Sequence, residues 1–206
     1  MDELKNLFSQ QGKLSQILTD YSTREGQTEM ALDINSAIQE RTSLIIEAGT
    51  GIGKTFAYLA PVLINGKKTI ISTGTKTLQD QLYNRDLPLL ASVLGRPIST
   101  SLLKGRSNYL CLHRLDDAYS QDKTIVNDLR IINEWKFQTD TGDLSELIGI
   151  SENSGVWPLV TCTNDNCPDP SYEKCYFFKA RKLAQNSDLS VINHHLLFAD
   201  MAMKEE

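Results

Sequence analysis

A glycine-rich loop carries the residues of this sequence with the clearest chemical potential. The stretch from Glu47 to Thr55 reads Glu-Ala-Gly-Thr-Gly-Ile-Gly-Lys-Thr and lies between two apolar runs. Glycines let the backbone curl with its N–H groups pointing inward, a lysine reaches the outer phosphates, and a threonine hydroxyl ligates Mg²⁺. We therefore predict a nucleoside triphosphate site formed by Ala48, Gly49, Thr50, Gly51, Ile52, Gly53, Lys54 and Thr55.

The sequence around this loop predicts a strand before it and a helix after it. The apolar run Leu44–Ile46 suits a short strand, and a helix beginning near Lys54 would add its positive end to the phosphate site. Ala48 replaces the glycine that usually opens such a loop. We expect this replacement to be tolerated, because the first position of the loop need not touch phosphate.

A longer helix is predicted upstream of the loop. Ser22 and Glu25 have the spacing of a capping box, with Ser22 as the N-cap. The helix that they open would run to about Glu40 and would turn an apolar face inward. The residues of that inner face are Met30, Ile34, Ala37 and Ile38.

Strands and helices alternate along the rest of the chain, which is typical of an α/β fold with a mainly parallel sheet covered by helices on both faces. Such a sheet would place the phosphate loop at the end of a strand. The remaining strands are predicted at 68–73, 98–103 and 189–192, with a helix at 75–82.

More than eighty residues separate the last two predicted strands, far more than a crossover needs. We interpret them as an inserted module. The segment 116–150 has apolar residues at helical intervals and predicts a helical arm, in which Trp135 is a core residue. Turn-forming residues surround the second half of the insertion, namely Asn164, Asp165, Asn166, Pro168, Asp169 and Pro170.

The insertion contains all four cysteines of the chain: Cys111, Cys162, Cys167 and Cys175. Four thiolates hold either a tetrahedral zinc ion or an iron–sulfur cluster. Structural zinc sites commonly bring two close cysteine pairs, whereas here only Cys162 and Cys167 form one. The spacing leans slightly toward iron and sulfur, and four buried thiols without a metal are the remaining alternative.

Composition and charge restrict the class of protein. The chain has 206 residues, 40% of them hydrophobic and 23% charged, as in a globular protein, and its net charge of -5 gives no overall attraction to nucleic acid. The segment Met1–Lys5 lacks the features of a signal peptide, and no apolar run would cross a bilayer. We expect a cytoplasmic protein with reduced cysteines and no membrane contact.

Basic and aromatic residues alternate near the end of the insertion. They suit a groove that binds a single nucleic-acid strand, and they suit an amphipathic helix with a solvated basic face equally well. The residues are Lys174, Tyr176, Phe177, Phe178, Lys179, Arg181 and Lys182.

Taken together and in order, several segments resemble the iron–sulfur DNA helicases of superfamily two, the XPD and DinG group, and most closely its bacterial DinG/YoaA branch. Residues 24–27 resemble the adenine-sensing Q motif, 47–55 helicase motif I, and 72–82 motif Ia. Residues 104–111 resemble the entry into the cluster module, and 191–197 the return to the sheet.

The resemblance implies a RecA-like domain and a role for each matching residue. Arg24 and Gln27 would contact adenine, while Lys54 and Thr55 would bind the phosphates of ATP and Mg²⁺. Thr73, Thr75, Gln79 and Arg106 would lie near DNA, with Arg106 also bracing a [4Fe–4S] cluster on Cys111, Cys162, Cys167 and Cys175.

The resemblance also implies a biological setting. Movement would run from 5′ to 3′ on single-stranded or forked DNA, in repair or replication. A clamp-loader accessory subunit of the replicative polymerase is an expected partner.

The expected division is 1–105 for the first part of the motor domain, 106–186 for the cluster module and 187–206 for the return to the sheet. The sequence lacks a DEAH-type motif, so no catalytic set is complete, and the second motor domain is missing. We therefore expect an N-terminal portion of a helicase that alone binds nucleotide weakly and does not unwind DNA. The alternatives are a non-catalytic nucleotide- or DNA-binding module and a phosphate-loop ATPase or kinase with a zinc-stabilised insertion.

Overall fold

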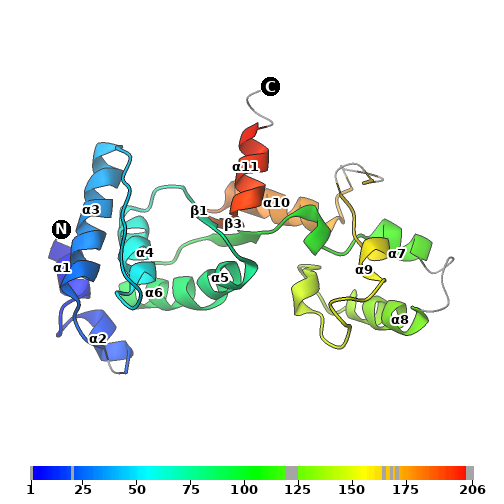
Figure 1. The fold of residues 1–206 in the computed structure, drawn as a ribbon, viewed down its shortest axis with the longest axis horizontal. Coiled ribbons are helices and arrows are strands. Elements are labelled where there is room, and N and C mark those ends of the chain that lie inside the picture. The colour runs from blue at the N-terminus through cyan, green and yellow to red at the C-terminus, as the bar shows by residue number, and fades with distance from the viewer. Residues whose placement is uncertain are drawn as a thin grey trace. The chain divides into compact units, whose positions relative to one another are not determined.

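The computed structural model describes residues 2–19, 21–118, 125–163, 166–167, 169 and 172–202 (Figure 1). Its contacts divide the chain into two compact units. The first unit comprises Met1–Leu102 and Ser187–Asn193, and the second comprises Leu103–Asn186 and His194–Glu206.

The first unit contains a small sheet with the strand order β1-β3-β2. Strand β1 (Thr69–Thr73) pairs in parallel with β3 (Leu189–Asn193), and β2 (Thr100–Leu103) lies on the other side of β3. The register sets Thr69 opposite Leu189, so the segment that follows the whole insertion returns to the centre of the sheet. The predicted strands at 68–73, 98–103 and 189–192 and the mixed α/β class are therefore confirmed.

The helices of the first unit pack around an apolar core. They are α1 (Asp2–Leu7), α2 (Lys13–Ile17), α3 (Glu25–Glu40), α4 (Lys54–Asn65), α5 (Lys76–Gln81) and α6 (Leu87–Leu94), with a π-helical turn at Leu82–Asp86 between the last two. The helices predicted after the phosphate loop and at 75–82 are confirmed. Core residues include Phe8, Leu14, Leu59, Leu90 and Val191.

Helix α3 buries a different face from the predicted one. Its buried residues are Gln27, Ala31 and Asn35, which recur every four residues. This face packs on α4, where Asn65 Nδ2 donates to Asn35 Oδ1 at 2.9 Å. The predicted inner-face residues Met30, Ile34, Ala37 and Ile38 instead line an open groove of about 290 Å³ with Thr42, Leu44 and Ile46.

The helix also begins later than the capping box predicted. Helix α3 begins at Glu25 and its N-cap is Arg24, which makes no side-chain cap bond. Ser22 is therefore not the N-cap. Because Glu25 is the first residue of the helix, it lies too early to reach back to a cap as the third residue of a capping box does.

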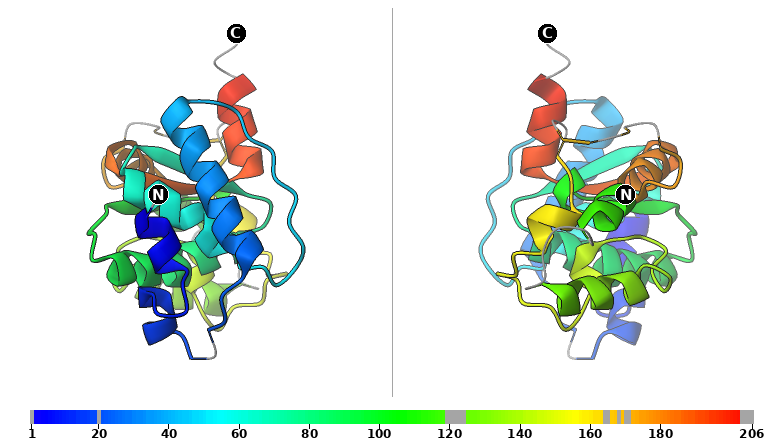
Figure 2. Two further views of the ribbon diagram at one scale, coloured as in Figure 1. Left: turned by 90° about the vertical axis from the view of Figure 1, so that its left-hand side faces the viewer. Right: turned by 90° about the vertical axis from the view of Figure 1, so that its right-hand side faces the viewer.

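The strand predicted at Leu44–Ile46 is absent from the structure. Residues 42–49 have no regular secondary structure, and they run back alongside α3 (Figures 1 and 2). Ile45 is 97% exposed and Leu44 is 44% exposed. A strand forms by hydrogen bonding to a neighbour, and the sheet of the described residues offers this segment none.

The second unit is mostly helical. Its helices are α7 (Leu112–Ala118), α8 (Val126–Trp135), α9 (Trp157–Val160), α10 (Tyr176–Asn186) and α11 (His194–Ala202), with short 3₁₀ turns at Arg106–Asn108 and Leu144–Glu146. A second apolar core holds Leu110, Leu115, Leu129, Ile132 and Val160.

The predicted helical arm 116–150 is correct only in part. Helix α8 covers its centre, residues 119–124 lie outside the described part, and residues 136–150 form turns and one 3₁₀ segment. Gly142 has a φ of 64°, and the Thr139 and Thr141 hydroxyls accept from the backbone N–H groups of Gly142 and Asp143. These side-chain bonds replace helical ones. Of the predicted turn formers, Asn164, Asp165, Pro168 and Pro170 lie outside the described residues.

Within the described ranges, the helices all fall short of the length and apolar character that a membrane span requires.

The buried face of α3 can be tested by comparing two alanines on the same helix. Ala31 is fully buried against α4, whereas Ala37 lines the open groove. We expect Ala31→Leu to lower the free energy of unfolding by about 1–3 kcal/mol through overpacking. Ala37→Leu should change it by less than about 0.5 kcal/mol. Urea denaturation followed by circular dichroism measures both, and equal losses would contradict this packing.

Candidate nucleotide and cysteine sites

The phosphate loop adopts a backbone that demands glycine at two positions. Gly51 and Gly53 both have a φ of 83°, in the left-handed region where other residues are strained. Gly53 is the N-cap of α4, so the positive end of that helix begins at the loop, as predicted. Gly49, Thr50 and Gly51 are exposed. The helix N-terminus and the exposed side of the loop suit it to an anion.

Lys54 bonds to its own loop. Its Nζ donates to the carbonyl oxygen of Ala48 at 2.9 Å and to that of Gly49 at 2.8 Å. The ammonium group therefore already lies beside the loop backbone. Phosphate oxygens would compete for the same donors, since a lysine has three.

Gln27 fixes the far end of the loop. Its side chain is 2% exposed, and Nε2 donates to the Gly53 carbonyl oxygen at 2.9 Å. A Cβ on Gly53 would lie 2.2 Å from this nitrogen and 3.5 Å from Arg24 Nη1. The structure thus brings Arg24 and Gln27 to the phosphate loop. Gln27 Oε1 is buried and makes no hydrogen bond to the described residues.

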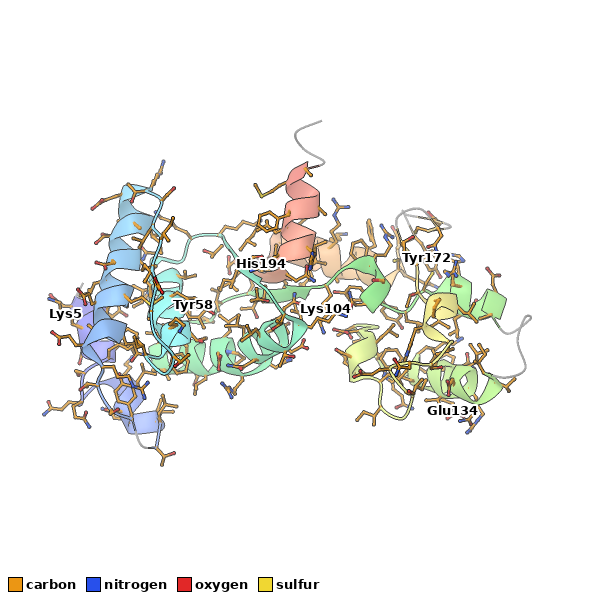
Figure 3. The ribbon with its side chains drawn as sticks, viewed as in Figure 1. Lys5, Tyr58, Lys104, Glu134, Tyr172 and His194 are labelled. Atoms are coloured by element: carbon orange, nitrogen blue, oxygen red, sulfur yellow. The ribbon has the colours of Figure 1, made fainter. Side chains whose placement is uncertain are left out.

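Tyr58, which the sequence did not single out, follows Thr55 by one turn of α4 (Figure 3). Burial raises the pKa of Tyr58 to about 12, the Thr55 side chain opposes this rise, and the Asp86 carboxylate adds to it. Tyr58 is therefore a neutral phenol at physiological pH.

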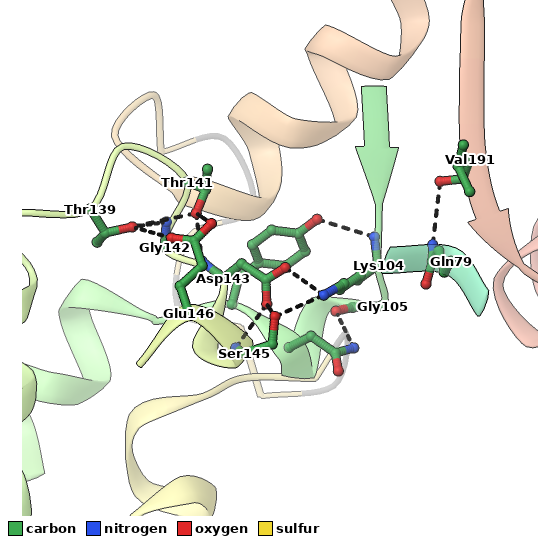
Figure 4. Close-up of polar contacts among 12 residues, drawn as sticks. Gln79, Lys104, Gly105, Thr139, Thr141, Gly142, Asp143, Ser145, Glu146 and Val191 are labelled. Carbon is green, nitrogen blue, oxygen red and sulfur yellow. Dashed lines mark hydrogen bonds and ion pairs between the residues drawn. The ribbon is translucent and has the colours of Figure 1, made fainter. Parts of the chain in front are cut away.

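The junction after β1 contains the three residues predicted to lie near DNA on this unit. Thr75 is the N-cap of α5, and its hydroxyl oxygen accepts from Leu78 N at 3.2 Å. Thr73 is buried and donates to the Thr75 carbonyl oxygen at 3.1 Å. Gln79 is fully buried, and its Nε2 donates to the Val191 carbonyl oxygen at 3.3 Å (Figure 4). Of the three, only Thr75 is exposed.

All four cysteines line one small cavity in the second unit, although Cys111 lies far from the other three in the sequence. Leu110, His113 and Tyr172 line the same cavity of about 10 Å³. Cys111 and Cys162 are buried, Cys167 and Cys175 are half-buried, and all four are free thiols. Among the described residues, no three histidine, cysteine or carboxylate side chains are arranged so as to hold a metal ion.

The thiols influence one another electrostatically. Burial raises the pKa of the Cys162 thiol to about 12, and the neighbouring Cys111 and Cys167 add to the rise. Arg106 opposes it, and its Nη1 lies 3.2 Å from Cys167 Sγ. The Arg106 guanidinium also stacks 4.4 Å from the centre of the Phe177 ring. The structure thus places Arg106 at the cysteine cavity.

The basic and aromatic stretch forms helix α10. Tyr176 is buried, and the Phe177 ring lies against Tyr109 and Arg106. Lys179, Arg181 and Lys182 are exposed. The structure favours the amphipathic helix over a groove of stacked bases, because Tyr176 and Phe177 pack against the second core.

The sequence did not reveal the buried ion pair of the second unit. Lys104 Nζ lies 2.7 Å from Asp143 Oδ2, and both side chains are almost fully buried (Figure 4). A lysine directly after a strand was the only signal, and many exposed lysines have the same setting.

Comparison with known proteins defines the class of protein to which the chain belongs. A family model for DEAD/DEAH box helicases matches residues 24–140, so the chain belongs to that family. The chain is 51% identical to the ATP-dependent DNA helicase YoaA of Haemophilus influenzae, over 99% of this chain and 33% of that protein. It is 47% identical to YoaA of Escherichia coli, over 96% and 32%.

A more distant match is the 3′-5′ exonuclease DinG of Bacillus subtilis, which is 32% identical over 91% of this chain and 21% of that protein. These matches confirm the resemblance to the DinG/YoaA branch. The chain spans about a third of the length of the YoaA relatives.

The requirement for glycine in the loop can be tested at two neighbouring positions. The alanine of Gly53→Ala would be strained by the φ of 83°, and its methyl group would clash with the Gln27 amide. A Cβ on Gly49 would lie 3.8 Å from Ile52 Cδ1, which is an ordinary contact. We expect Gly53→Ala to lower the free energy of unfolding by about 1–3 kcal/mol. Gly49→Ala should leave it nearly unchanged. Thermal and urea unfolding compare the two variants. Similar losses of unfolding free energy would refute a specific requirement for glycine at position 53.

Proposed function

We propose that this chain forms the ATP-binding first motor unit and the cysteine module of an ATP-dependent 5′-3′ DNA helicase of the DinG/YoaA branch. The substrate is single-stranded or forked DNA, and the setting is repair or replication. The observation that carries the proposal is the phosphate loop, in which Gly51 and Gly53 hold left-handed conformations directly before Lys54. The proposed division of the chain remains 1–105, 106–186 and 187–206.

Nucleotide binding follows from the side chains around the loop. Lys54 would exchange its carbonyl partners for phosphate oxygens, and Thr55 would offer its hydroxyl oxygen to Mg²⁺. Gln27 Oε1 accepts a hydrogen bond from the amino group of adenine, because this buried oxygen has no partner among the described residues. Its Nε2 keeps the bond to Gly53.

Contact with DNA is proposed at the start of α5. Thr75 and Lys76 are exposed there and offer a hydroxyl and a charge to a phosphate backbone. Thr73 and Gln79 hold this junction from inside, since both are buried and bonded to the protein.

The cysteine cavity is proposed to hold a [4Fe–4S] cluster. The support is chemical: four free thiols line one cavity, and Arg106 beside Cys167 would offset the negative charge of the thiolates that hold a cluster. When bound, a cluster would supply the positive charge that displaces the thiol protons and would join Cys111 to the segment that carries the other three cysteines. Phe177 holds the Arg106 guanidinium at this position.

Replacement of Lys54 tests the nucleotide site. We expect Lys54→Ala to raise the dissociation constant for a non-hydrolysable ATP analogue with Mg²⁺ at least tenfold, a loss of about 1.4 kcal/mol. Binding to single-stranded DNA should be unchanged. Isothermal titration measures the first and fluorescence anisotropy the second. Lys5→Ala, an exposed lysine on α1, is the control. Equal analogue affinities would overturn the nucleotide assignment.

Metal analysis tests the cysteine site. We expect anaerobically purified protein to show a broad visible charge-transfer band and about four irons per chain. Cys111→Ser should lose both. Colourless protein with about one zinc per chain would instead indicate a Cys₄ zinc site. That result would refute the cluster while leaving the nucleotide site intact.

A further inference from the structure

A fully buried lysine stands at the entrance to the cysteine module. The Lys104 side chain is 2% exposed, and its Nζ lies 2.7 Å from Asp143 Oδ2 and donates to Ser145 Oγ at 2.9 Å (Figure 4). Asp143 Oδ1 accepts from the backbone N–H of Ser145 at 3.0 Å and from its hydroxyl at 2.9 Å. The ion pair is therefore extended into a network that also satisfies the second carboxylate oxygen.

Such a pair is a costly way to gain stability. Removing two charges from water costs free energy, and their attraction offsets this cost only when the geometry is excellent. Replacing such a pair by apolar residues of the same volume often leaves the protein equally stable or more stable. A buried ion pair does, however, fix the two segments that it joins in one relative position, since any other position leaves a charge unpaired.

The segment that carries Asp143 is itself held rigidly. The Thr139 and Thr141 hydroxyls both donate to the Glu146 carboxylate, at 3.2 and 2.7 Å. Gly142 has a φ of 64°, and a Cβ there would lie 2.2 Å from the Tyr176 ring. Tyr176 follows Cys175 directly, so this loop packs against the segment that carries one of the four thiols.

The segment that carries Lys104 leads to another thiol. Tyr109 forms an antiparallel bridge with Asp143, and the backbone N–H of Leu110 donates to the Gly142 carbonyl oxygen at 2.9 Å. Cys111 is the next residue. The Tyr109 hydroxyl accepts from the backbone N–H of Lys104 at 3.1 Å, which closes the turn that contains Arg106.

We propose that Lys104 and Asp143 are positioning residues for the cysteine site, which they serve by fixing Cys111, Cys175 and Arg106 around one loop. This inference rests on the proposed function, because it assumes that the four cysteines hold a cluster. The pair acts through the backbone of residues 104–111 and 142–145.

The test uses the whole chain, reconstituted anaerobically with ferrous iron and sulfide. Asp143→Asn keeps the volume and removes the charge, while the double variant Lys104→Met with Asp143→Leu replaces the pair by apolar residues and keeps the unit folded if the single variant does not. The readouts are the rate at which the visible absorption disappears with an iron chelator and the visible circular dichroism of the cluster. Arg130→Ala, which breaks an exposed ion pair with Glu134 on α8, is the matched control.

We expect both variants to lose the cluster about tenfold faster than the unaltered protein, as outer partners of metal ligands commonly do. Their circular dichroism bands should change shape, while Arg130→Ala matches the unaltered protein. If the double variant keeps the cluster as long as the unaltered protein and with the same circular dichroism, the pair does not position the cysteine site and the inference is wrong, whether or not the unfolding midpoint has changed. An unaltered chain that takes up no iron overturns the proposed cluster, and this role with it.

Discussion

The hydrogen bond from Gln27 to Gly53 is the contact on which the nucleotide site depends. It joins α3 to the last turn of the phosphate loop through a side chain that is almost fully buried. The amide occupies the space that a Cβ on Gly53 would need, so the glycine serves both the left-handed backbone and this close approach. At the other end of the same helix pair, Asn65 bonds to Asn35. Two polar contacts thus set the register of α3 on α4, while Ala31 between them allows the helices to approach closely.

In the second unit, a buried contact between charged side chains likewise fixes one chain segment against another. Its apolar core gives cohesion, because Leu129 and Ile132 on α8 are completely shielded from water. Apolar contacts have little directionality, however, and a site for four thiols needs several chain segments at fixed distances. The Lys104–Asp143 pair and the turn at Gly142 supply that direction. Arg106 then meets Cys167 from one side and Phe177 from the other, which places a positive charge where the thiols would ionise.

Three sequence interpretations were wrong, and a fourth was correct only in part, for related reasons. The run Leu44–Ile46 is apolar but has no strand beside it among the described residues, and a strand cannot form alone. The predicted inner face of α3 followed hydrophobicity, whereas the actual interface prefers small and hydrogen-bonding residues because α4 and the phosphate loop pack closely there. Ser22 matched a capping pattern, yet the helix begins beyond it. Within the predicted arm, helix α8 ends at Trp135. Beyond it, the Thr139 hydroxyl accepts from the backbone N–H of Gly142, whose φ of 64° is not helical.

The sequence by itself determined the phosphate loop, the helix after it, the three strands of the small sheet and the membership of a helicase family. These features depend on local rules, namely which residues tolerate a left-handed backbone, which periods bury one face, and which motifs occur in which order. Only the tertiary structure decided that Gln27 reaches Gly53, that the buried Gln79 donates to the Val191 carbonyl oxygen, and that Lys104 meets Asp143. Such pairings join residues far apart in the chain, and their partners are fixed by the packing of whole elements rather than by any neighbouring residue.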